Sequence, residues 1–165
     1  MDNDFVLGLI KKDKYILNKT RPKFQEINRS YRMNIDLKSD DDKLKYTMFI
    51  RQTTRFAEDF SVGLRIDPPN QHFTTTMTLL RFQGPHGGQS EDGMSLHNSF
   101  HMHRLTEADV ALGRYKPRCA PDEVEYSGME EAIVSFLDYC NIKDPYGIFD
   151  EERDMINQIK MDLPL

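Results

Sequence analysis

The sequence predicts an α+β fold: one antiparallel sheet of about five strands, with helices at the N-terminus and the C-terminus packed on one face of that sheet. Three observations predict it. Apolar residues recur at helical spacing near the start of the chain, alternate with polar residues in the middle, and return to helical spacing near the end. With 165 residues, 38% of them hydrophobic, the chain has the size and apolar content of one domain. We therefore expect a single domain over residues 1–165, with an N-terminal helical and basic segment at 1–29, a sheet core at 30–104 and C-terminal helices at 127–160.

The N-terminal segment begins with an amphipathic helix. Within residues 2–12, Phe5, Val6, Leu9 and Ile10 fall on one helical stripe. Residues 13–29 are mixed and basic, and they predict a second short helix or a loop. The charge of this region suits either a solvated surface or the binding of phosphates. The basic residues of the region 11–32 are Lys11, Lys12, Lys14, Lys19, Arg21, Lys23, Arg29 and Arg32.

The middle of the chain predicts the sheet. Apolar and polar residues alternate over 31–37, 44–50 and 60–66, and residues 73–82 are rich in threonine, leucine and phenylalanine. Short turns separate these four segments, which indicates an antiparallel meander with one buried face. A fifth strand is predicted at 97–103, after a glycine-rich loop at 83–98.

The C-terminal part predicts two helices. Ser127 and Glu130 have the spacing of a capping box, and Ile133, Phe136 and Leu137 follow on one helical face. Pro145 and Gly147 break the chain, and the last helix is expected at about 148–160.

Composition excludes several classes of protein. No apolar run approaches the length of a membrane span, and the acidic N-terminus (Met1 to Asp4) is unlike a secretory signal. Two cysteines, Cys119 and Cys140, are too few for a disulfide scaffold or a cysteine-built zinc site. We expect a cytoplasmic protein without a membrane partner.

The histidines are the main chemical lead, because all five lie between positions 72 and 103. If 97–103 is a strand, His97, His101 and His103 point to one side, and Phe100 and Met102 point to the other. The spacing of His101 and His103 lets two imidazoles meet a common metal ion or a common phosphate.

Three interpretations of this cluster remain open. The histidines, or His86 with Asp92, can bind a divalent metal ion, or they can be exposed strand residues or members of a polar network that fixes the glycine-rich loop. Without a metal, one histidine can act as a general base and another as a general acid in RNA cleavage, with Arg81 or Arg104 stabilising the charge on phosphate. We adopt the metal-free interpretation and expect no cofactor.

An ordered series of short motifs runs through the second half of the chain: Leu80-Arg81-Phe82, Gly84-Pro85-His86, Asp92-Gly93, His101-Met102-His103, Thr106-Glu107 and the segment Phe136 to Ile142. This series resembles a family of small bacterial proteins of unknown function carried on phages and other mobile elements, and distantly the TumE-type toxins of toxin–antitoxin systems. The resemblance covers about residues 74–142. It implies a site made by Arg81, His86, Asp92, His101, His103 and Glu107. The residue after the strand arginine departs from the pattern, because Phe82 and Gln83 stand where members often have an acidic residue.

Two functional hypotheses follow. The first is a toxin or phage-defence-type protein that acts on RNA as a ribonuclease. The second is a non-enzymatic binding protein from a mobile element, such as an anti-CRISPR-like inhibitor or an antitoxin-like partner, whose ligand is another protein. Glu107 serves either as a helix cap or as the carboxylate that orients a histidine. The expected catalytic residues are His101, His103, Arg81 and Glu107, and the expected substrate-binding residues are His86, Asp92, His97 and Arg104.

Overall fold

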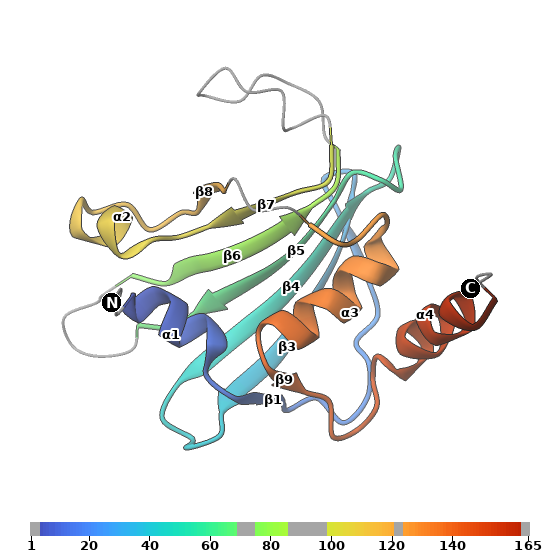
Figure 1. Cartoon of the computed structure of the whole chain (residues 1–165), viewed down its shortest axis with the longest axis horizontal. Coiled ribbons are helices and arrows are strands. Elements are labelled where there is room, and N and C mark those ends of the chain that lie inside the picture. Colours follow the sequence, from blue (N-terminus) through green and yellow to red (C-terminus); the bar gives the residue numbers. More distant parts are fainter. Residues whose placement is uncertain (1–3, 69–74, 86–98, 121–123, 163–165) are drawn as a thin grey trace.

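The computed structural model describes residues 4–68, 75–85, 99–120 and 124–162, and its centre is a nine-stranded sheet that curls into a half-barrel (Figure 1). Four short helices accompany the sheet in these residues. In chain order the elements are α1 (Phe5–Lys11), β1 (Lys14–Ile16), β2 (Gln25–Ile27), β3 (Ser30–Ser39), β4 (Lys45–Thr53), β5 (Phe60–Ile66), β6 (Met77–Gln83), β7 (His101–Arg104), α2 (Glu107–Ala111), β8 (Arg118–Cys119), α3 (Met129–Tyr139), β9 (Ile142–Lys143) and α4 (Asp150–Asp162).

The sheet is larger than predicted, and it is mixed. Its strand order is β8-β7-β6-β5-β4-β3-β1-β9, with β2 paired to β3. The pairs between described strands are antiparallel, except that β1 and β9 run parallel. The prediction of a five-stranded antiparallel sheet is therefore wrong. Strands β1, β2, β8 and β9 are only two or three residues long, which is too short for an alternating pattern to be recognised.

The helices also differ from the prediction. Helices α1 and α3 lie on one face of the sheet, whereas α4 contacts α3 and extends away from the sheet (Figure 1). The expectation that the terminal helices all pack on the sheet is wrong for α4. Residues 13–29 contain the short strands β1 and β2 with an irregular segment between them, where a second short helix or a loop was expected. None of the helices in the described ranges combines the length and the apolar character needed to cross a membrane.

The capping interactions are formed by other residues than the sequence predicted. Helix α3 follows Gly128 at its N-cap, which makes no side-chain cap bond, and Ser127 Oγ donates to Glu131 over 3.0 Å. The capping box predicted for Ser127 and Glu130 is therefore not formed. A capping box does begin α2, where Thr106 and Asp109 satisfy each other's backbone N–H groups.

The alternating strands separate an apolar face from a polar face. In β5, Phe60, Val62, Leu64 and Ile66 all point to the face that α1 and α3 cover, and all four are buried. Phe136 of α3 packs into the same core. We call the opposite face, which is turned away from α1 and α3, the outer face; it carries the polar residues of β3 to β7 and holds the candidate site.

Candidate functional site

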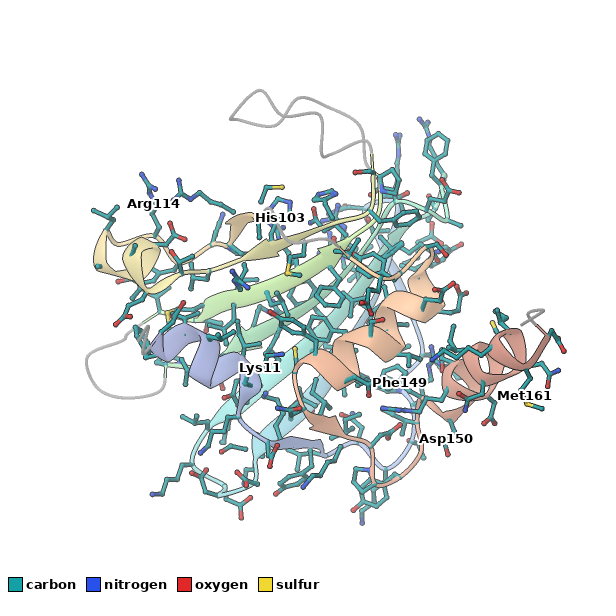
Figure 2. The ribbon with its side chains drawn as sticks, viewed as in Figure 1. Lys11, His103, Arg114, Phe149, Asp150 and Met161 are labelled. Atoms are coloured by element: carbon teal, nitrogen blue, oxygen red, sulfur yellow. The ribbon has the colours of Figure 1, made fainter. Side chains whose placement is uncertain are left out.

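The pairing of β6 with β7 brings three of the predicted site residues together. His103 is the direct cross-strand partner of Arg81, and His101 is the partner of Gln83. Partners in an antiparallel pair project from the same side of the sheet, and Met102 between the two histidines is buried in the core. The imidazoles therefore stand on the outer face beside the Arg81 guanidinium, and Figure 2 shows His103 on the side of β7 away from α1 and α3.

His101 is held on both sides of its ring. Its Nδ1 lies 2.7 Å from the carbonyl oxygen of Ser99, and its Nε2 lies 3.1 Å from Oε1 of Gln83. The amide nitrogen of Gln83 donates in turn to Ser61 Oγ over 3.2 Å, which is consistent with Oε1 facing the imidazole. The ring centroids of His101 and His103 are 5.0 Å apart.

The two imidazoles are largely shielded from solvent, with exposed fractions of 3% for His101 and 9% for His103. Arg81 is half-buried. Its Nε atom is buried and has no hydrogen-bond partner among the described residues. Burial and the nearby Arg51 guanidinium lower the pKa of Arg81 from its ordinary value. Arg81 is thus a desolvated cation whose hydrogen-bonding capacity is only partly used.

The other predicted residues lie elsewhere. Arg104 is the cross-strand partner of Leu80, so it lies on the helix-covered side, and its Nη1 donates to Tyr139 Oη over 3.4 Å. Glu107 is exposed in the first turn of α2, and Asp109 makes the cap. His86, Asp92 and His97 lie outside the described residues.

The outer face also contains a basic groove, which we define by its six cationic lining residues. It has a volume of about 570 Å³, and no acidic side chain in the described part of the chain lines it. Of the basic run at 11–32, only Lys23 and Arg32 reach it. The alternation of β3 to β5 predicts outward side chains, but only the pairing of the strands shows that they converge. The six residues are Lys23, Arg32, Arg51, Arg65, Arg81 and Lys116.

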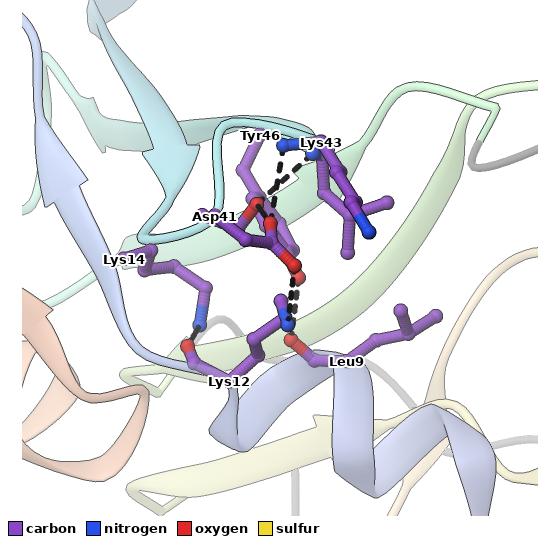
Figure 3. A network of polar contacts seen from close by, with 8 residues as sticks. Leu9, Lys12, Lys14, Asp41, Lys43 and Tyr46 are labelled. Atoms are coloured by element: carbon purple, nitrogen blue, oxygen red, sulfur yellow. Dashed lines mark hydrogen bonds and ion pairs between the residues drawn. The ribbon is translucent and has the colours of Figure 1, made fainter.

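A second polar cluster includes Lys12, Lys14 and Asp41 and lies near the other edge of the sheet (Figure 3). Lys14 is completely buried, and its Nζ donates to the carbonyl oxygens of Ile10, Lys12 and Cys140 over 2.6–2.7 Å. Nearby, the exposed Lys12–Asp41 ion pair is 3.0 Å long. Because three backbone carbonyls occupy the ammonium group, the role of Lys14 is to join elements and not to bind a ligand.

Metal-binding groups do not converge in the described residues: no set of three or more His, Cys, Asp or Glu side chains there has the arrangement to hold a metal ion.

The strand pairing adds one residue that the sequence reasoning had not placed in the site. Cys119 is the cross-strand partner of His103, so its thiol shares the outer face with that imidazole.

Comparison of the chain with protein-family models, curated proteins and solved structures gives no match.

Proposed function

We propose that the protein acts on RNA, in a toxin or phage-defence role in the cytoplasm, through the outer-face histidines and Arg81. The observation that supports this function is the β6–β7 register, which sets His103 opposite Arg81 and His101 one step along the same face. Two imidazoles and one guanidinium are the groups that metal-free RNA cleavage needs. The resemblance to TumE-type toxins favours the same setting.

In this reaction, the 2′-oxygen of a ribose bonds to the adjacent phosphorus while the bond from phosphorus to the 5′-oxygen breaks. The products are a 2′,3′-cyclic phosphate and a 5′-hydroxyl. A base accepts the proton of the 2′-hydroxyl, and an acid supplies a proton to the leaving oxygen. Arg81 stabilises the negative charge that develops on the phosphate.

The surroundings of the two imidazoles favour different roles. Ser99 and Gln83 present an acceptor to each nitrogen of His101, which suits the cationic ring because both of its N–H groups can donate. His101 is therefore the proposed acid. The other imidazole, His103, is the direct cross-strand partner of Arg81, and it is the proposed base.

The test combines substitutions with a chemically matched substrate. Cleavage of an RNA oligonucleotide should fall at least about 100-fold in the His101→Ala/His103→Ala variant and about 100-fold in Arg81→Gln. Arg104→Gln is the matched control, because this arginine lies on a neighbouring strand but on the opposite face. A substrate with deoxyribose at the cleaved position should resist the parent protein.

The result is decisive if the variants keep the thermal midpoint of the parent. Full cleavage by folded His101→Ala/His103→Ala protein, or cleavage of the deoxyribose substrate, would exclude the proposed mechanism. Equal losses in Arg81→Gln and Arg104→Gln would remove the role of Arg81.

One observation favours a non-enzymatic binding protein as the second candidate: both imidazoles are shielded from solvent, and both ring nitrogens of His101 contact protein oxygens. In that case the cluster stabilises the outer face and a partner binds beside it. Stable capture of RNA or a protein by the parent, without RNA cleavage at any pH from about 5 to 8, would favour this candidate.

A further inference from the structure

The basic groove contains a pair of like charges that the fold does not need. Arg32 of β3 and Arg51 of β4 are direct cross-strand partners, an arrangement that destabilises a sheet. Both side chains are exposed, and the ion pairs formed among the described residues include neither of them. An anion bound between the two guanidinium groups would convert this repulsion into attraction.

Apolar surface lies among these charges. Phe49 is half-buried, lines the groove and leans over Gly63 on the neighbouring strand, while the guanidinium carbon of Arg65 lies 5.0 Å from the Phe49 ring centroid. Ile27 of β2 also lines the groove and is 42% exposed. A ligand that suits this lining carries several negative charges and flat apolar faces.

The size of the groove restricts the ligand further. About 570 Å³ is typical of a site for a small ligand, so the groove can hold a few nucleotides but not a duplex. In a duplex the base faces are stacked on each other, whereas an unpaired strand can place them on aromatic rings and guanidinium planes.

We propose that the basic groove binds an unpaired RNA strand, with its phosphates on Arg32 and Arg51 and its bases against Phe49 and Ile27, and leads the strand to Arg81. This inference rests on the proposed function for the identity of the ligand as RNA. Arg81 connects the two sites, because it lines the groove and is also the cross-strand partner of His103.

The test measures binding separately from cleavage. The probe is a short, fluorescently labelled 2′-O-methyl RNA without secondary structure, which lacks the nucleophile and cannot be cut by the proposed reaction. Arg32→Gln/Arg51→Gln is compared with Lys38→Gln/Lys45→Gln. The second variant removes the same charge from another cross-strand pair of the same two strands, outside the groove lining.

We expect the parent to bind the probe, with affinity that falls steeply between about 50 and 200 mM salt. Arg32→Gln/Arg51→Gln should bind at least about tenfold more weakly, with a log–log salt slope smaller by about 1.4. Lys38→Gln/Lys45→Gln should stay within about twofold of the parent, and the thermal midpoint of Arg32→Gln/Arg51→Gln should not fall.

Three results would overturn the inference: equal weakening in the two double variants, equal affinity for a duplex of the same sequence, or no binding at about 50 mM salt. The proposed function fails separately. If the parent cuts RNA and Arg32→Gln/Arg51→Gln binds normally, only the groove assignment is wrong. If the groove variants behave as expected but RNA is never cut, only the cleavage proposal is wrong.

Discussion

Lys14 is a single residue on which three segments of the chain depend. Its ammonium group donates to carbonyl oxygens at the end of α1, before β1 and after α3. Lys14→Met preserves the length of the side chain but leaves these buried carbonyls without a donor, so we expect the free energy of unfolding to fall by about 3 kcal/mol in urea titrations. Lys12→Met is the control and should lose far less stability than Lys14→Met, because its ion pair with Asp41 is exposed to solvent. Equal losses would contradict this assignment.

The same residue predicts a dependence of stability on pH. Burial lowers the pKa of Lys14 from 10.5 to about 8 in the folded protein, so the ammonium form that matches three carbonyls is present at pH 7. Between pH 8 and 10.5 the unfolded chain binds more protons than the folded one, and the contribution of Lys14 to the free energy of unfolding therefore rises with pH, by up to about 3 kcal/mol. Subtracting the pH profile of Lys14→Met isolates this contribution. A difference that stays flat or falls would show that the folded pKa is not lowered.

At the level of single residues, the sequence predicts on which face of the sheet a side chain lies better than it predicts which residues surround that side chain. Alternation placed His101 and His103 on one face and Met102 on the other, and the structure has that arrangement. It could not predict that Gln83 contacts His101, because that contact depends on the register between β6 and β7. Nor could it predict that Arg104 projects toward Tyr139, since Arg104 lies just past the predicted strand end.

At the scale of elements, the pairing of β4 with β5 depends on a glycine. Gly63 is the direct partner of Phe49, and a Cβ atom at Gly63 would collide with the Phe49 ring. Gly63→Ala should therefore lower the free energy of unfolding by about 1–3 kcal/mol, and Phe49→Ala in the same chain should recover part of that loss. Urea titrations of the two single variants and the double variant give the coupling energy.

Gly8→Ala is the matched control for this cycle, because space is open around Gly8 in α1 and alanine is the better helix former. It should leave stability unchanged or raise it. Strictly additive losses for Gly63→Ala and Phe49→Ala would mean that the two residues do not depend on each other.

The length of an element decides how well the sequence predicts it. Strands β3, β4, β5 and β6 have seven to ten residues. The first three contain enough alternation to be recognised, and β6 is recognised by its content of threonine, leucine and phenylalanine. Arg32 and Arg51 show what a correctly predicted strand still leaves unknown. Arg32 lies within one predicted strand and Arg51 directly after the next, but their juxtaposition follows only from the register. The basic groove was missed for this reason.

At the scale of the whole molecule, segments that are far apart in the sequence meet at one edge of the sheet. Strand β1 near the N-terminus runs parallel to β9 beyond α3, and the central strands extend to β8 on the other side. Such pairings join segments that share no local pattern, so the predicted five-stranded fold lacked them. The net charge does not predict the basic groove either. It is −5 for the whole chain, yet one face of the sheet carries a groove lined by six cationic side chains.

The attachment of α4 gives the last prediction, because an ion pair between the N-terminal segment and α4 holds this helix. Arg21 pairs with Glu152, whose side chain is 8% exposed, and the guanidinium carbon of Arg21 lies 5.2 Å from the centroid of the Phe149 ring. Arg21→Ala leaves a buried carboxylate without this partner, so we expect the free energy of unfolding to fall by about 1–3 kcal/mol and hydrogen exchange in α4 to become faster.

The Arg21→Ala/Glu152→Ala variant should be more stable than Arg21→Ala alone, because the unpaired charge is gone. If the double variant is the less stable of the two, burial of Glu152 is not the source of the loss, and α4 is held mainly by the packing of its apolar residues such as Ile156.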